Sequence, residues 1–354
     1  MKVGILTVHR AINIGAVLQT YALQEILKSF GHDAYVINYV QEKVERTDRE
    51  KYDLKKRVDF LFHLHLRGFL TFGSLKNRVA SRYKIFDDFL LQYLRLTPEC
   101  DKDHIPQDFD AYVIGSDQLW NSNIFGYHDD VFWGNFKRKV ESKVFAYADS
   151  TTVENIKSSS QEYIIKSLMN FEDISVREKE VADYLNQNFK LDKSVKLVLD
   201  PTLTVDKSVW DKMKTGKFSD EKYVLVYAAR VYQKDPNAIM NQAKSIADKL
   251  GCKVKTLDLH TATDFVDLIS NAQYVLSSSY HGVVFSLIFN KPLYAILYGD
   301  NQDKRYYNLL HLVGAEKMLA NIDDDVQPQM IDYTTINEKI SELALYSRNF
   351  LKQI

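Results

Sequence analysis

The stretch that decides the fold is YVLSSSYHGVVFSLIFNKP, residues 274–292. It begins with a short apolar run typical of a buried strand, and its apolar second half predicts a helix that stops before Pro292. A polar Ser/Tyr/His/Gly turn therefore lies where a strand leads into a helix. In α/β proteins such turns bind ligands, because the free N–H groups and the dipole of a helix N-terminus attract anions. His281 in this turn can exchange a proton near neutral pH; a histidine that only caps the helix would give the same pattern.

The same order of apolar strand, polar turn and helix recurs along both halves of the chain. Near the N-terminus, strands are predicted at residues 3–8 and 34–39, on either side of a helix that Gly31 ends. This β-α-β unit implies a parallel sheet with a right-handed crossover. Further strands are predicted at 111–114, 144–148, 173–176, 195–199, 223–228, 253–257, 274–276 and 293–297. The sequence therefore predicts an α/β protein of two Rossmann-like, doubly wound domains that face each other across a cleft.

Two domains are also the usual arrangement for a chain of 354 residues. The boundary is predicted where Pro201 and the polar residues after it follow the last strand of the first half. The N-terminal domain is then expected to cover residues 1–205 and the C-terminal domain residues 206–330. A terminal helix is predicted over 331–354.

A helical insertion is predicted at about residues 45–98, where the strand and helix pattern is interrupted. Its segment 51–96 is aromatic and basic, and residues 51–84 carry nine Lys or Arg against two acidic residues. A basic amphipathic segment such as 51–84 can lie on an anionic membrane surface. It can equally pack on its own domain and present a solvated basic face.

Composition argues against several classes of protein. The net charge of −1 gives no general attraction to nucleic acid. Cys100 and Cys252 are isolated thiols without metal-ligand spacing, which indicates a reducing compartment and no disulfide scaffold. No apolar run is long enough to span a membrane, and the first apolar run is too short for a signal peptide. We therefore expect a cytoplasmic protein without a metal site, with peripheral contact at the inner face of the membrane as the alternative.

Polar residues at two other strand ends are candidates for binding. Asn13 and Gly15 stand just before a helix, where they could bind a hydroxyl or an anion, or simply cap the helix and form its turn. Asp117 lies in GSDQLWN, residues 115–121, beside an indole. Its carboxylate could accept a proton from a sugar hydroxyl, or it could cap a helix.

Two arginines also follow predicted strands. Arg177 comes after a strand of the first half, and Arg230 after the first strand of the second half. A guanidinium is a natural bidentate partner for phosphate or carboxylate, and either residue could instead form an ion pair within the protein.

Taken in order, these segments resemble the polysaccharide pyruvyl transferase family. The resemblance extends over about residues 1–300. The matching pieces are GILT (4–7), NIGAVLQTYALQ (13–24), VINY (36–39), GSDQLWN (115–121), SVREK (175–179), LDPT (199–202), SYHGVVFS (279–286) and NKP (290–292).

The resemblance implies a fold like that of the GT-B glycosyltransferases and a role in surface polysaccharide, exopolysaccharide or capsule biosynthesis. The implied reaction transfers pyruvate from phosphoenolpyruvate to a sugar and forms a ketal across two hydroxyls. Phosphoenolpyruvate is then the donor substrate, and no cofactor, metal or nucleic acid is expected. The acceptor is a sugar or a lipid-linked oligosaccharide.

The resemblance also implies roles for individual residues. His281 is the expected acid and phosphate partner, and Asp117 is expected to bind the acceptor or act as base. The residues expected to bind substrate are Asn13, Gly15, Gln19, Arg177, Arg230, Ser279, Tyr280 and Gly282.

Ser279 departs from the family pattern, in which an arginine stands two residues before the histidine. The donor anion would then be held by Arg230, by Arg177 or by the helix N-terminus, or the donor is a different one. Two other functions therefore stay open. One is a glycosyltransferase whose nucleotide-sugar diphosphate binds at residues 279–282, and the other is a non-catalytic component of polysaccharide assembly.

Overall fold

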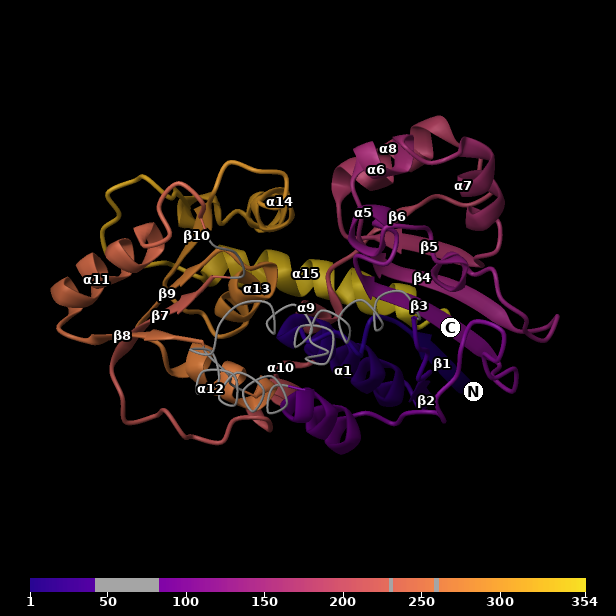
Figure 1. The fold of residues 1–354 in the computed structure, drawn as a ribbon, viewed down its shortest axis with the longest axis horizontal. Helices are drawn as coiled ribbons and strands as arrows, with labels where there is room; N and C mark the ends of the chain where they lie inside the picture. Colours follow the sequence, from indigo (N-terminus) through magenta and orange to yellow (C-terminus); the bar gives the residue numbers. More distant parts are fainter. Residues whose placement is uncertain (42–82, 229–231, 258–260) are drawn as a thin grey trace, which may run out of the picture. The chain divides into compact units, whose positions relative to one another are not determined.

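The computed structural model describes residues 1–41, 83–228, 232–257 and 261–354. The chain forms two units, one of Met1–Leu197 together with Ile354 and one of Val198–Gln353. Each unit is built on its own parallel β-sheet with helices between the strands (Figure 1).

The first unit contains a six-stranded sheet in the order β2-β1-β3-β4-β5-β6. Its strands are β1 (Lys2–Leu6), β2 (Asp33–Val36), β3 (Ala111–Asp117), β4 (Lys143–Asp149), β5 (Asp173–Val176) and β6 (Lys196–Leu197). Its helices are α1 (Ile14–Ser29), α5 (Ser122–Phe125), η1 (Asp130–Trp133), α6 (Val153–Lys157), α7 (Gln161–Leu168) and α8 (Lys179–Asn188). The chain passes from β1 through α1 to β2 and later returns on the other side of β1 as β3. The strand order therefore reverses between β1 and β3, where α/β sheets bind ligands.

The second unit contains a five-stranded parallel sheet in the order β11-β10-β9-β7-β8. Its strands are β7 (Tyr223–Tyr227), β8 (Lys253–Thr256), β9 (Tyr274–Ser277), β10 (Leu293–Leu297) and β11 (Leu319–Asn321). Its helices are α9 (Pro201–Thr204), α10 (Lys207–Asp211), α11 (Ala238–Leu250), α12 (Ala262–Asn271), α13 (Tyr280–Ile288), α14 (Lys304–Val313), η2 (Glu316–Met318) and α15 (Thr334–Leu351). Here the order reverses between β7 and β9, so that the turn from β9 into α13 lies at the ligand-binding edge.

The predicted fold class of two doubly wound α/β domains is confirmed. The division between the units falls after Leu197, whereas the sequence placed it after residue 205. The difference is α9, which packs against α13 and α15 of the second unit. Two hydrogen bonds secure this segment, from Leu199 N to Ser347 Oγ at 2.9 Å and from Trp210 Nε1 to the Thr202 carbonyl at 3.1 Å.

Most of the predicted helical insertion, including nearly all of the basic segment 51–84, lies outside the described residues. Its described part includes a helix over residues 83–93. Phe89 and Tyr93 of this helix stack at 4.7 Å, and both rings contact Tyr21 of α1 edge-on. Residues 83–93 therefore pack on the first unit. No helix in the described ranges is long and apolar enough to cross a membrane.

Gly115 is a position where the sheet requires a glycine. Its φ is +126°, and a Cβ there would lie 2.0 Å from the carbonyl oxygen of Tyr147 on the neighbouring strand. Gly31 also has a positive φ, +83°, but a Cβ there would meet nothing within 4 Å. We expect Gly115→Ala to lower the free energy of unfolding by about 3 kcal/mol or more, through backbone strain and overpacking together.

Gly31→Ala serves as the matched control, because it introduces backbone strain alone and should cost about 1 kcal/mol. Urea unfolding of the two variants and the wild type measures both values. Equal losses in the two variants would contradict the close approach of β3 to β4 at Gly115.

Candidate active site

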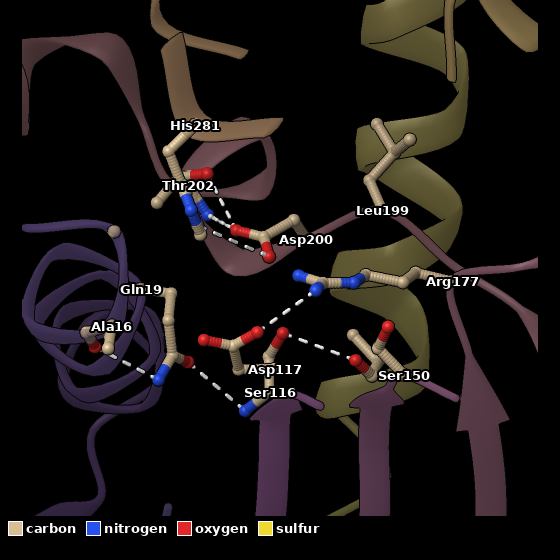
Figure 2. Close-up of polar contacts among 12 residues, drawn as sticks. Ala16, Gln19, Ser116, Asp117, Ser150, Arg177, Leu199, Asp200, Thr202 and His281 are labelled. Atoms are coloured by element: carbon tan, nitrogen blue, oxygen red, sulfur yellow. Dashed lines mark hydrogen bonds and ion pairs between the residues drawn. The ribbon is translucent and has the colours of Figure 1, made fainter. Parts of the chain in front are cut away.

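In the first unit, Gln19 joins helix α1 to the ends of β1 and β3 (Figure 2). Its Oε1 accepts a hydrogen bond from Ser116 N at 3.1 Å, and its Nε2 donates to Thr7 Oγ1 at 2.9 Å and to the Ala16 carbonyl at 3.0 Å. The Gln19 side chain is fully buried. Both the oxygen and the nitrogen of its amide form hydrogen bonds within the protein. Gln19 therefore holds the ends of β1 and β3 in position.

Asn13 caps α1, which is one of the two interpretations that the sequence left open. Its Oδ1 accepts from Gly15 N at 2.9 Å and from Ala16 N at 3.3 Å. Gly15 lies buried in the first turn of the helix and not in a turn that requires a positive φ. The exposed Asn13 thus fixes the start of α1 at the edge where Gln19 lies.

Asp117 and Arg177 form a buried ion pair at this edge. Arg177 Nη2 lies 3.1 Å from Asp117 Oδ1, and its Nε lies 3.6 Å from Glu178 Oε1. The Arg177 side chain is only 2% exposed. Arg177 therefore interacts with carboxylates of its own unit, which is the ion-pair interpretation of this residue (Figure 2).

The geometry of Asp117 leaves one of its carboxylate oxygens available. Asp117 has a φ of +83°, a left-handed conformation that is uncommon outside glycine. Its Oδ1 pairs with Arg177 Nη2 at 3.1 Å and accepts a hydrogen bond from Gln118 N at 2.9 Å. Within the described ranges of the chain, Oδ2 accepts no hydrogen bond. This oxygen can therefore accept a proton or a hydrogen bond from a hydroxyl.

Asp149 and Glu178 complete the charged cluster, and the sequence did not assign a role to either. The sheet register places Asp149 of β4 opposite both Asp117 of β3 and Val176 of β5. Glu178 Oε1 accepts a hydrogen bond from Ser150 Oγ at 2.6 Å. Burial raises the pKa of the Asp149 carboxyl well above its usual range; Arg177 opposes the rise, and the charges of Glu178 and Asp117 add to it.

In the second unit, the turn between β9 and α13 is fixed by Ser277. Ser277 Oγ donates to the Tyr227 carbonyl at 2.9 Å and accepts from Ser279 N at 3.1 Å, which joins the ends of β7 and β9. A Cβ at Gly282 would lie 2.1 Å from Ser277 Oγ and 2.8 Å from Tyr227 Cδ1. Only a glycine lets the first turn of α13 approach the sheet this closely.

The N-terminus of α13 carries polar groups that the helix itself does not use. Ser279 is the N-cap residue, but its side chain makes no capping hydrogen bond. The Ser278 hydroxyl is buried and has no hydrogen-bond partner among the residues that the structure describes. The Tyr280 ring meets the His281 ring edge-on at 5.2 Å. This helix start combines N–H groups and hydroxyls that suit an anion.

His281 lies beside Asp200, a residue of the LDPT segment to which the sequence assigned no role (Figure 2). His281 Nε2 is 3.9 Å from Asp200 Oδ2, an ion-pair distance longer than a hydrogen bond. Asp200 is fully buried, and its Oδ1 accepts from Thr202 N and Thr202 Oγ1 at 3.0 and 2.6 Å. A carboxylate at this distance stabilises positive charge on the imidazole.

Among the predicted site residues, Arg230 lies outside the described residues. Asp117, Arg177, Asn13, Gly15 and Gln19 gather at the edge of the first sheet, and Ser279, Tyr280, His281 and Gly282 gather at the edge of the second. The described ranges contain no group of three or more His, Cys, Asp or Glu side chains that could hold a metal ion.

In open α/β sheets, ligands bind at the carboxyl ends of the strands where the strand order reverses, and the polar side chains of both units gather at these edges. The polysaccharide pyruvyl transferase family matches residues 13–301, and the chain belongs to that family. It is thus a member of a transferase family of polysaccharide biosynthesis. No curated protein sequence matches the chain.

Three solved structures illustrate what the chain is similar to. The UDP-GlcNAc 2-epimerase from Methanocaldococcus jannaschii is 11% identical with a TM-score of 0.47, over 97% of this chain and 93% of that one. The UDP-GlcNAc 2-epimerase from Neisseria meningitidis bound to UDP-GlcNAc is 12% identical with a TM-score of 0.48, over 99% and 93%. The spinosyn rhamnosyltransferase SpnG complexed with thymidine diphosphate is 10% identical with a TM-score of 0.40, over 99% and 92%.

The buried ion pair of Arg177 leads to a prediction about stability. Arg177→Ala would leave the buried Glu178 and the partly buried Asp117 without their cation, so we expect a loss of about 3 kcal/mol in the free energy of unfolding. Lys179→Ala is the matched control two residues away, because Lys179 pairs with Asp183 at the exposed surface. It should cost less than about 1 kcal/mol. Chemical denaturation of both variants measures the losses, and a small loss for Arg177→Ala would contradict the buried pair.

Proposed function

We propose that the protein transfers pyruvate from phosphoenolpyruvate to two hydroxyls of a sugar in a surface polysaccharide, with release of phosphate. Membership of the family supports the reaction class. The observation that carries the proposal is the His281–Asp200 pair at the N-terminus of α13, beside the buried hydroxyl of Ser278. This place offers a proton donor and anion-binding groups together, and phosphoenolpyruvate needs both.

The reaction requires an acid at the donor. Protonation of the methylene carbon makes a methyl group and leaves positive charge on the adjacent carbon, which the first sugar hydroxyl attacks. The bond from that carbon to the phosphate oxygen then breaks, and the second hydroxyl closes the ketal. Of the two hydroxyl protons, one balances the proton given to the methyl group and the other leaves on phosphate. His281, with the Asp200 carboxylate 3.9 Å away, is the proposed acid.

The reaction also requires a base at the acceptor. We assign this role to Asp117, because its Oδ2 accepts no hydrogen bond within the described ranges while Oδ1 is fixed by Arg177. Arg177 and Gln19 are assigned to positioning and not to substrate contact, since both are buried and used within the first unit. The acceptor is proposed to be a sugar or a lipid-linked oligosaccharide.

Ser279 favours one alternative. Without an arginine at this position, the groups that the structure describes at the start of α13 are N–H groups and hydroxyls, which suit the diphosphate of a nucleotide sugar as well as a single phosphate. A glycosyltransferase is therefore the second candidate. Thermal-shift measurements with phosphoenolpyruvate and with a panel of nucleotide sugars separate the two, because a ligand of the native state raises the melting temperature.

His281 provides the test of the proposed chemistry. With phosphoenolpyruvate and an oligosaccharide acceptor, we expect His281→Ala to lower kcat by about 10²–10⁴-fold, the usual contribution of a general acid. His311→Ala is the control, because His311 is exposed on α14 and pairs with Glu316 at 3.4 Å. It should leave kcat unchanged. Phosphate release and the ketal methyl signal by NMR measure the rates.

Ser278 tests the binding part separately. We expect Ser278→Ala to weaken binding of phosphoenolpyruvate by about 5–10-fold, since one neutral hydrogen bond contributes about 1 kcal/mol. Ser270→Ala is the control, as its hydroxyl bonds the Asp267 carbonyl within α12. Equal phosphoenolpyruvate affinities for wild type and Ser278→Ala, or phosphate release that survives in His281→Ala, would contradict the assignment of this turn to the donor.

A further inference from the structure

Asp149 is a buried carboxyl group that the proposed chemistry does not use. It ends β4, it is 0% exposed, and neither of its carboxyl oxygens has a hydrogen-bond partner in the described part of the chain. A buried polar group without a partner costs stability, and an apolar side chain of similar shape would avoid that cost. The presence of a carboxyl group here therefore requires an explanation.

Among the residues that the structure describes, one cation and two other carboxyl groups act on the charge of Asp149. Asp117 lies opposite it on β3, and Arg177 and Glu178 follow β5 on its other side. Arg177 is already engaged by Asp117 at 3.1 Å and by Glu178 at 3.6 Å. One guanidinium thus faces three carboxyl groups, and it cannot neutralise all of them in a buried site.

The charge state of Asp149 decides whether two or three carboxylates compete for the Arg177 guanidinium. Burial and the charges of Glu178 and Asp117 raise its pKa, against the opposing effect of Arg177. While Asp149 is uncharged, Arg177 is left to Asp117 and Glu178. Once Asp149 ionises, it becomes a third anion that attracts the same guanidinium.

We propose that Asp149 is a positioning residue that acts through Arg177, holding the guanidinium on Asp117 while Asp149 is uncharged and competing for it once ionised. Asp149 thereby sets the upper pH limit at which Asp117 is held in place. The catalytic consequence rests on the role proposed for Asp117, whereas the competition for Arg177 does not. The two are therefore tested by different measurements.

The first test measures stability against pH. Below the pKa of an unfolded aspartic acid, about 3.9, Asp149 is protonated in the native and in the unfolded protein, and its contribution to the stability of the native protein is fully present. Above it the unfolded chain has lost a proton that the native protein keeps, so stability falls as pH rises towards the native pKa. Relative to Asp149→Asn, the folding equilibrium constant of the wild type should fall about tenfold per pH unit over this window.

Asp173→Asn is the matched control, because Asp173 lies at the opposite end of β5 and pairs with Lys196. Asp149→Asn should become more stable relative to the wild type as the pH rises. Asp173→Asn should show no such rise. If the free energies of unfolding of the wild type and Asp149→Asn changed in parallel from pH 4 to 9, Asp149 would not be an uncharged buried acid in the native protein, and the proposal would be wrong.

The second test observes Arg177 directly and needs no substrate. The side-chain Nε resonance of Arg177, assigned by its loss in Arg177→Lys, should shift with pH in the wild type as Asp149 ionises. The same resonance should stay constant in Asp149→Asn and shift in Asp173→Asn as in the wild type. A resonance that shifts identically in Asp149→Asn would overturn the competition for Arg177, whatever reaction the protein catalyses.

The third test applies to turnover. The wild type should lose activity on the alkaline side of its pH profile, and Asp149→Asn should keep its neutral activity while the alkaline loss disappears. An alkaline loss that persists in Asp149→Asn would overturn the catalytic consequence. If no pyruvyl transfer is observed with any variant, the proposed function fails, and the stability and resonance measurements still decide the role of Asp149.

Discussion

The carboxyl ends of parallel strands all meet at one edge of a sheet, and both units of this protein depend on that constraint. Where the strand order reverses, neighbouring strands send their helices to opposite faces and leave backbone groups between them that need partners. In the first unit the Gln19 amide accepts a hydrogen bond from the Ser116 N–H and also donates one to the Thr7 hydroxyl. In the second unit the Ser277 hydroxyl donates to the Tyr227 carbonyl and accepts from the Ser279 N–H. Each fixed edge then presents the next polar side chains in a defined geometry.

The two edges differ in electrostatic character. Among the described residues, the edge of the first sheet gathers Asp117, Asp149 and Glu178 around the guanidinium of Arg177, so the charge of this cluster is negative even while Asp149 is uncharged and becomes more negative once Asp149 ionises. Such an edge suits an uncharged ligand that offers hydroxyl groups. The edge of the second sheet offers hydroxyls, a helix N-terminus and His281, which suit an anion. The proposed division into an acceptor edge and a donor edge rests on this difference in charge.

The sequence allowed the fold class and the strand-to-helix turns to be predicted, because the apolar runs and polar turns are local patterns. Asp117 and His281 could be selected because each stands directly at the end of a strand or the start of a helix. Asp149 and Asp200 also directly follow predicted strands, but nothing local in the sequence assigned a role to either. Asp149 becomes significant through the register that places it between Asp117 and Arg177, and Asp200 through the packing of α9 against α13. Gln19 stands in a recognisable segment, yet only the folded chain shows that its amide is fully used inside the first unit.

The serine at position 279 changes how a donor anion would be held. Arg177 was one possible replacement for the absent guanidinium, but it is engaged by Asp117 and Glu178, and releasing it would leave those carboxylates buried without a cation. A helix N-terminus contributes about 0.3–2 kcal/mol to an anion, whereas each hydrogen bond to a charged group contributes about 1.5–3 kcal/mol. The dipole of α13 therefore cannot replace a bidentate arginine by itself. At the described start of α13, the groups that could supply the rest are the hydroxyls of Ser278 and Ser279 and the imidazole of His281, while Arg230 lies outside the described residues. In the proposed reaction, the Asp200 carboxylate beside His281 would then matter for holding the donor as well as for the acid.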